Sequence, residues 1–229
     1  MRGLGETEFV AQLRSLAGRY HHLHPFHLRM NAGELTVDEL RRWAANRFYY
    51  QRQIPLKDAA ILANCPEPEV RRVWLSRIVD HDGAAPGTGG TDGWVRLGEA
   101  VGLIREELLD ERHVLPGVRF AVDAYVTFCR TQPWIEAVAA SLTELFGPAA
   151  MRERVAALEV RYPWIDPAGL DYFRARVDQA PRDASYALGL VVARCRTDEQ
   201  QQRAVAALAF KCDVLWAQLD AIARGETRP

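Results

Sequence analysis

The sequence predicts an all-α fold, a single compact helical domain that covers residues 1–229. Apolar residues recur at the spacing of helix faces along the chain, and we find no convincing strand pattern. Residues 36–39 and 197–200 have the composition of helix capping boxes, with Ser/Thr followed three positions later by Glu or Gln. Since no internal repeat or linker interrupts the chain, we expect the helices to form one domain.

The helices of the first half are separated by turns rich in proline and glycine. The capping box at 36–39 begins a long helix, which we expect to be distorted at Pro55 because proline has no N–H and clashes with the preceding turn. Residues 81–90 form a Gly-rich loop that lacks the Gly-x-Gly-x-x-Gly and Gly-Lys-Ser/Thr patterns of phosphate-binding loops. Thr91 can cap the helix that follows. The predicted helices span residues 7–18, 37–63, 67–80, 91–101 and 104–111.

The second half is broken at Gln132-Pro133 and Gly147-Pro148, and its last helix begins at the second capping box. We also expect a break near Pro181. The predicted helices span residues 115–131, 133–146, 148–159, 167–178, 181–195 and 197–223.

The composition is that of an ordinary globular protein, with a formal net charge of −1. This balance gives no indication of binding to nucleic acid or to an acidic membrane. No apolar run approaches the roughly 18 residues of a membrane span, and the first residues lack a secretory core, so we expect a cytoplasmic protein. The four cysteines are expected to be buried, reduced thiols: Cys65, Cys129, Cys195 and Cys212.

The segment that follows Trp43 carries an unusual mixture of polar groups for a long helix. Arg47, Tyr50 and Gln51 stand at i, i+3 and i+4 and share one face, and Lys57 follows after Pro55. A surface helix typically carries Glu and Lys pairs, and a core helix carries Leu, Ile and Val. The mixture therefore predicts the wall of a polar pocket that binds an anion.

Four histidines cluster at positions 21, 22, 24 and 27, which suggests a metal site. However, no carboxylate or cysteine lies among them and Pro25 interrupts any helix there, so we favour a helix end with one or two imidazoles facing a pocket and the rest exposed. A di-iron bundle needs two Glu-x-x-His pairs, and the chain offers only the near match 110–113. A haem ligand remains open, because any one histidine could serve.

Other candidate residues lie on different helices. His81 ends an apolar helix, where it can transfer protons at a site rim or stabilise the helix C-terminus. Tyr172 and Arg176 stand at i and i+4, and Lys211 lies in an apolar run where an unpaired ammonium is costly. Glu144 is a candidate partner for Lys211 or for an arginine. Together these residues predict a pocket for a small, planar polyanion held by arginines.

Eight segments resemble the pyrroloquinoline quinone synthase family, in the family's order and over nearly the whole chain. They are residues 24–27, 46–51, 54–60, 77–83, 113–125, 141–146, 162–164 and 210–220. The resemblance implies a fold similar to haem oxygenase, used without haem or metal. It also implies a cofactorless oxidase that closes a ring and removes eight electrons from a tricarboxylate quinoid precursor. Dioxygen is the co-substrate, hydrogen peroxide and pyrroloquinoline quinone are products, and a homodimer is expected.

The same resemblance implies roles for individual residues. His81 would be the general acid/base, while Tyr172 and Arg176 would close over the ligand and handle oxygen and reduced intermediates. Carboxylate and quinone oxygens would be bound by Arg47, Gln51, Lys57, Arg77, Arg154 and Lys211. The pocket would also be lined by Tyr20, His21, Tyr50, Tyr125 and Glu144.

The chain departs from the family pattern at two places. Met151 stands where a family member has an active-site histidine, and its apolar side chain could help to wall an oxygen pocket. The loop after Gly83 lacks the acidic and histidine residues expected there. The alternatives to a cofactorless oxidase are a haem or metal oxygenase on the same fold and a non-catalytic protein that stores or delivers the quinone.

Overall fold

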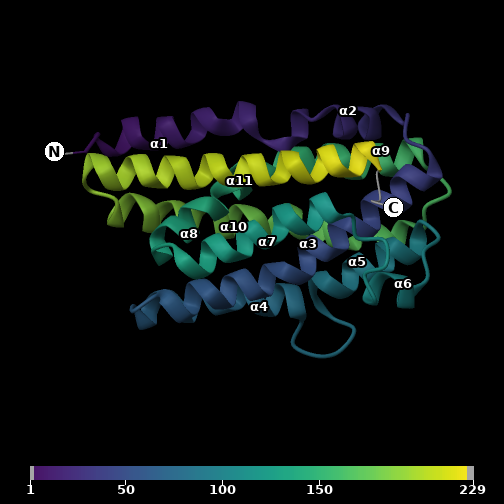
Figure 1. Ribbon diagram of the computed structural model, residues 1–229, viewed down its shortest axis with the longest axis horizontal. Coiled ribbons are helices and arrows are strands. Elements are labelled where there is room, and N and C mark those ends of the chain that lie inside the picture. Colours follow the sequence, from purple (N-terminus) through teal and green to yellow (C-terminus); the bar gives the residue numbers. More distant parts are fainter. Residues whose placement is uncertain (1–2, 226–229) are drawn as a thin grey trace.

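The computed structural model describes residues 3–225, and this part of the chain is helical, without a β-strand (Figure 1). The all-α prediction is therefore confirmed. The α-helices are α1 (Glu6–Ser15), α2 (Pro25–Ala32), α3 (Val37–Asn64), α4 (Pro68–Asp82), α5 (Gly89–Ala100), α6 (Arg105–Leu109), α7 (Pro116–Thr131), α8 (Trp134–Ala140), α9 (Gly147–Arg161), α10 (Asp171–Arg194) and α11 (Asp198–Arg224). Four short 3-10 helices join them, η1 (Leu16–Arg19), η2 (His21–Leu23), η3 (Ser141–Leu145) and η4 (Pro167–Leu170).

The long helices α3 and α11 organise the packing. α3 contacts α4, α5 and α7, and α11 contacts α7 and α8. In Figure 1 α11 runs beside α1 along one edge of the molecule, and α4 lies along the opposite edge. Apolar side chains from α1 through α11 join one core cluster. Helices that pack around a shared core can each turn polar residues toward a common interior site.

α3 begins at the predicted capping box. The Thr36 hydroxyl accepts a hydrogen bond from the Glu39 amide, and the Glu39 carboxylate accepts one from the Thr36 amide. The helix continues past Pro55 to Asn64. It buries apolar residues on one side and Arg47 and other polar residues on another, so it contributes both to the core and to a polar interior surface.

The break predicted between residues 178 and 181 is wrong, because α10 continues through Pro181. Proline removes one backbone hydrogen bond from a helix interior. The packing of α10 against α8, α9 and η3 offsets this loss. Continuity through Pro181 keeps residues on both sides of it on a common helix face.

The prediction for the histidine cluster is also wrong in two respects. Pro25 begins α2 instead of interrupting a helix, because a proline at the first helical position loses no intrahelical bond. His24 caps this helix, and its Nδ1 accepts a hydrogen bond from the Phe26 amide at 3.0 Å. His21, His24 and His27 are all buried, so the remaining imidazoles are not exposed.

Smaller differences concern helix ends. The segment predicted as one helix over 133–146 divides into α8 and the tighter η3. α5 begins at Gly89 and has Thr88 at its N-cap position, not Thr91. All four cysteines are buried and free, as predicted. Among residues 3–225, no helix is long and apolar enough to cross a membrane.

Candidate functional site

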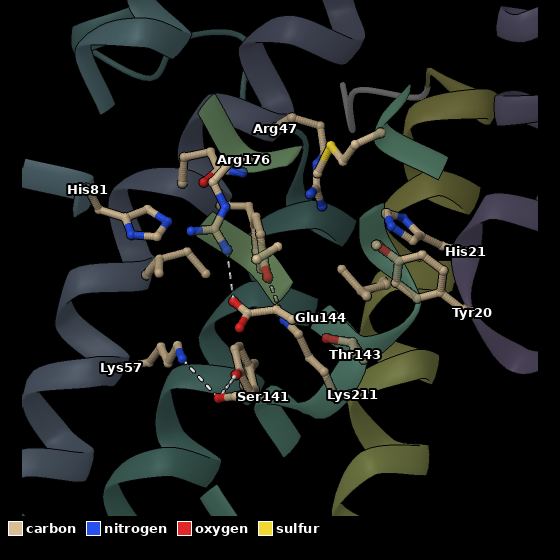
Figure 2. A pocket seen from close by; sticks show the side chains of 18 of the residues that line it. Tyr20, His21, Arg47, Lys57, His81, Ser141, Thr143, Glu144, Arg176 and Lys211 are labelled. Atoms are coloured by element: carbon tan, nitrogen blue, oxygen red, sulfur yellow. Dashed lines mark hydrogen bonds and ion pairs between the residues drawn. The ribbon is translucent and has the colours of Figure 1, made fainter. Parts of the chain in front are cut away.

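One cavity of about 80 Å³ brings together every residue that was predicted for the site. α3 and α4 form one side of this cavity, and η3, α10 and α11 contribute to the other sides (Figure 2). The predicted residues that line it are Tyr20, His21, Arg47, Tyr50, Gln51, Lys57, Arg77, His81, Tyr125, Glu144, Arg154, Tyr172, Arg176 and Lys211. Apart from these, the lining includes Ser141, Thr143 and Met151.

Three of the six cations in the lining are paired with carboxylates, Asp58, Glu144 and Asp183. Nζ of Lys57 lies 2.6 Å from Oδ1 of Asp58. Arg77 is bidentate to Glu144, with Nη2 at 2.7 Å and Nη1 at 2.9 Å from the carboxylate oxygens. Arg176 contacts the same Glu144 at 3.2 Å, as the dashed line in Figure 2 shows. The partner of Glu144 is thus an arginine pair and not Lys211.

Asp183 completes this network, at 3.2 Å from Arg77 and 3.3 Å from Arg176. Burial by itself raises the pKa of Glu144, but the charges of Arg77 and Arg176 outweigh it and lower the pKa below its ordinary value. Glu144 therefore remains ionised, and it holds both guanidinium groups at the cavity wall.

The other three cations, Arg47, Arg154 and Lys211, have no carboxylate within ion-pair distance in residues 3–225. Nη1 of Arg47 donates to Oε1 of Gln218 at 2.9 Å, and its guanidinium lies over the Tyr50 ring. Burial lowers the pKa of Arg47 and lowers that of Arg154 to about 10. Nearly complete burial of three uncompensated positive charges is costly. Such a site has a strong affinity for an anion.

Arg154 contacts a neutral partner on α2. Its Nη2 lies 3.1 Å from Nδ1 and 3.3 Å from Nε2 of His27. Because Nδ1 of His27 bonds the carbonyl of His21 at 2.9 Å, the arginine faces an imidazole with one acceptor nitrogen. Burial, with the charge of Arg154, lowers the pKa of His27 well below its ordinary value.

The geometry of His81 is compatible with both roles that the sequence left open. Its Nδ1 bonds the Arg77 carbonyl in the last turn of α4 at 2.9 Å, and its ring points toward the cavity in Figure 2. With the proton on Nδ1, Nε2 carries the free lone pair. Burial and then the charge of Arg176 lower the pKa of His81 to about 4. The imidazole is therefore a neutral base at pH 7.

Tyr172 is held at the cavity by groups from two other helices. Its hydroxyl donates to Oε1 of Gln51 at 3.0 Å, and its ring lies 5.3 Å from that of Trp94 on α5. Two glycines of α5 make this approach possible. A Cβ at Gly90 would lie 3.0 Å from Cε2 of Tyr172, and one at Gly93 would lie 3.1 Å from its Cβ.

The sequence analysis missed several residues that complete the site. Asp58 and Asp183 supply buried negative charge, Gln218 contacts Arg47, and Ser141 accepts a hydrogen bond from Nζ of Lys57 at 3.0 Å. A signal existed for Asp183, since it lies two turns after Arg176 on one face. The break wrongly expected at Pro181 concealed that relationship.

Met151 lines the cavity, in agreement with the position inferred for it. The loop after Gly83, residues 84–88, contributes no side chain to the lining. Within residues 3–225, no three His, Cys, Asp or Glu side chains are grouped so that they could hold a metal ion. The lining is rich in cations and phenols, which suit an organic anion.

Comparison of the sequence with known proteins identifies related proteins. The model of the TENA/THI-4/PQQC family matches residues 10–221. A pyrroloquinoline-quinone synthase of Cronobacter sakazakii is 53% identical over 226 residues, which cover 99% of this chain and 90% of the relative. A protein of the same name from Pseudomonas aeruginosa is 53% identical over 220 residues, 96% of this chain and 88% of the relative.

Solved structures support the fold. A domain of unknown function with a haem oxygenase-like fold, from Shewanella denitrificans, superposes with a TM-score of 0.79 at 12% identity and covers 96% of this chain and 93% of that chain. A TenA homologue from Pseudomonas syringae has a TM-score of 0.74 at 17% identity, with coverage of 95% and 92%. The expected similarity to the haem oxygenase fold is confirmed.

Proposed function

The chain belongs to the TENA/THI-4/PQQC family, and from this premise we propose that it is an oxidoreductase that completes the synthesis of pyrroloquinoline quinone. Its reaction is ring closure and eight-electron oxidation of a tricarboxylate quinoid precursor by dioxygen, with release of hydrogen peroxide. The relatives that share about half of its residues over nearly their full length carry the name pyrroloquinoline-quinone synthase. The proposal also agrees with the chemistry of the cavity.

One observation carries the proposal on the structural side. The cavity holds three buried cations without a carboxylate partner in the described part of the chain, Arg47, Arg154 and Lys211. A tricarboxylate brings three negative charges, so each cation would gain a partner on binding. Arginine adds geometric selectivity, because its planar fork matches a carboxylate.

His81 is positioned to accept protons during the oxidation of the substrate. The reaction begins when the substrate amine attacks to close the new ring. Nε2 of the neutral His81 then accepts a proton as two electrons leave the ring system. Each two-electron oxidation passes two electrons and two protons to one dioxygen and yields one hydrogen peroxide. The substrate supplies the redox chemistry, and the protein supplies binding and proton transfer.

Anionic intermediates gain stabilisation from the same lining. Enolate charge that develops on the ring and the charge of reduced oxygen both lie near preorganised cations in a site that excludes bulk water. Arg176 and Tyr172 share the N-terminal half of α10, and we assign them to this step. Arg77 and Glu144 hold Arg176 in place through the buried network.

The test is anaerobic mixing of purified protein with the tricarboxylate precursor, followed by addition of oxygen. We expect the absorbance of the quinone and hydrogen peroxide to appear after the addition. His81→Asn should slow quinone formation by about 100-fold, the scale of a general base, whereas His113→Asn changes an exposed histidine outside the cavity and should leave the rate unchanged.

Three results would overturn the proposal or a part of it. A protein that binds the precursor but consumes no oxygen would be a storage or delivery protein. Wild-type rates in His81→Asn would remove the role of His81. We further propose that the reaction needs no resident haem or metal, and stoichiometric iron in active protein, or a haem absorbance band, would contradict that.

The assembly and location are part of the same proposal. We propose a homodimer in the cytoplasm, on the basis of the family relationship. Light scattering of the purified protein should give twice the mass of the single chain, and cell fractionation should recover it with cytoplasmic enzymes. A monomer with full activity would show that one chain suffices.

A further inference from the structure

The whole chain contains two lysines, Lys57 and Lys211, and both are buried in the cavity wall, at 2% and 1% exposure. Every other residue in the Lys and Arg total is an arginine. Unlike a guanidinium, an amine can lose its proton and become a nucleophile. The two amines differ in their nearest partner, which is a carboxylate for Lys57 and a phenol for Lys211.

Lys57 is held as an ammonium. Its Nζ lies 2.6 Å from Oδ1 of Asp58, and it donates a hydrogen bond to Oγ of Ser141 at 3.0 Å. Asp58 is itself fully buried and also contacts Arg77 at 3.4 Å. An ammonium that binds a buried carboxylate has no free lone pair for attack on an electrophile.

Lys211 has no such partner among residues 3–225. Its Nζ bonds the hydroxyl of Tyr50 at 2.9 Å and lies 3.4 Å from the centre of the Tyr125 ring. These contacts are compatible with either protonation state, because a tyrosine hydroxyl can accept from an ammonium or donate to an amine. Figure 2 shows the side chain extending into the same cavity as Glu144, which pairs with arginines instead.

Without a bound anion, the charges around Lys211 favour the neutral amine, whereas a carboxylate bound beside it would favour the ammonium. Burial lowers its pKa well below the ordinary value, and the positive charges of Lys57 and Arg47 act in the same direction. The thiols of Cys129 and Cys212 oppose this only weakly, because burial raises the pKa of each to about 11 and keeps them neutral. The attraction of the ammonium to the two phenol rings opposes it too, but is small beside the cost of burying an unpaired charge.

We propose that Lys211 is a nucleophilic amine that captures a small carbonyl compound bearing a carboxylate, such as a short 2-oxo acid, as an imine. The Nζ lone pair attacks the carbonyl carbon to form a carbinolamine. The carbinolamine then loses one water, which contains the former carbonyl oxygen and the two hydrogens of the amine. A C=N bond remains. No oxidant or reductant takes part. Desolvated lysines beside a second cation are a known route to such chemistry.

The other unpaired cations determine which carbonyl compounds enter. Arg47 and Arg154 offer guanidinium groups without carboxylate partners, so they favour a ligand with its own carboxylate. A short 2-oxo acid combines this carboxylate with the carbonyl that Lys211 attacks. This capture does not depend on the oxidase function, since it requires neither the quinoid precursor nor dioxygen.

The experiment uses glyoxylate, a two-carbon aldehyde with a carboxylate, with cyanoborohydride to reduce the imine to a stable secondary amine. Peptide mapping by mass spectrometry then locates the modified lysine in the folded wild-type protein at pH 7. We expect modification at Lys211 at least about tenfold faster than at Lys57. Equal labelling of the two, preferential labelling of Lys57 or no labelling at Lys211 would each overturn the proposal.

Two controls separate local chemistry from general reactivity. In guanidinium chloride the two lysines should label at similar rates, because their environments are then alike. Acetaldehyde, which has no carboxylate, should label Lys211 about tenfold more slowly than glyoxylate, and an equal rate would remove the role of Arg47 and Arg154. The map is made on the wild-type protein, so the result does not depend on a lysine variant that folds.

Discussion

Each buried charge in this protein has an energy that depends on its partner more than on its residue type. Lys57 and Lys211 are the same side chain at similar burial, yet one binds a buried carboxylate and the other binds a phenol. The paired charge contributes to the folded state. The unpaired charge is held at a cost to stability that the binding of an anion can offset.

The two lysines allow a direct test of this difference with the same substitution. Lys57→Met leaves the buried Asp58 carboxylate with the Trp74 indole and with Arg77 at 3.4 Å as its remaining partners, so we expect a loss of about 3 kcal/mol in the free energy of unfolding. Lys211→Met replaces an amine whose burial without a carboxylate partner opposes its protonation in the folded protein, and should raise that free energy by about 1 kcal/mol. Urea unfolding without ligand measures both, and losses of equal size would contradict the assignment of partners.

Lys211→Met should be more stable than the wild type without ligand, but it should gain less stability from a bound ligand. Lys211→Met removes one of the three cations available to a tricarboxylate, so pyrroloquinoline quinone should raise the unfolding temperature of this variant less than that of the wild type. Stability without ligand and stabilisation by ligand should thus change in opposite directions. If Lys211→Met raises both the stability without ligand and the stabilisation by ligand, the extra stability is unrelated to the anion site.

Protonation of His81 predicts how stability depends on pH. The unfolded chain binds a proton near pH 6.5, whereas burial lowers the pKa of His81 in the folded protein to about 4. Stability is therefore complete above about pH 6.5 and decreases as the pH falls toward 4, because the unfolded state then binds more protons.

For this one group the expected loss between pH 7 and pH 5 is about 2 kcal/mol. Burial also lowers the pKa values of His21 and His27, and these groups add to the loss in the same direction. Urea unfolding at the two pH values should show a smaller loss in His81→Asn than in the wild type. An identical loss in both proteins would mean that His81 is protonated in the folded state at pH 5.

At the scale of elements, close approach between α5 and α10 positions a site residue. Gly90 and Gly93 leave room for Tyr172, whose hydroxyl reaches Gln51 on α3. A Cβ cannot rotate away from a contact, so alanine at these positions must displace Tyr172 or separate the helices. Small displacements at an active site can cost large factors in rate.

Gly93→Ala tests this role. The new Cβ would lie 3.1 Å from Cβ of Tyr172, so we expect turnover of the quinoid precursor to fall roughly tenfold. The matched control is Gly189→Ala in α10, where nothing lies within 4 Å of the added Cβ. This control should keep wild-type turnover and gain about 0.5–1 kcal/mol of stability from helix propensity. Equal turnover in both variants would show that the α5 contact does not position Tyr172.

At the scale of the whole molecule, the helices share one core. We infer that residues 3–225 fold as a single domain, since the core cluster contains residues from the first helix to the last, such as Phe9 on α1, Trp43 on α3 and Leu208 on α11. A core that includes both ends of the chain couples the unfolding of the helices.

Cooperative unfolding is therefore expected. Loss of helical circular dichroism and the change in tryptophan fluorescence should have the same midpoint in urea. Two separate transitions would indicate that part of the chain unfolds independently, and the single-domain inference would then be wrong.

The sequence by itself determined the helical class, most helix boundaries and most of the residues that line the cavity. Periodicity and capping boxes are local properties, so α3 and α11 begin where the chain alone indicates. The family resemblance supplied residues such as Arg154 and Tyr20, for which the local pattern gave no indication.

Only the tertiary structure decided which charges are paired. The pairs between Arg77 and Glu144 and between Arg176 and Asp183 depend on helices that meet in space and on a helix that continues through Pro181. Local sequence opposes that continuity, and packing against neighbouring helices outweighs the lost hydrogen bond. The difference in protonation between Lys57 and Lys211 has the same origin, because the groups that surround a buried amine determine its pKa.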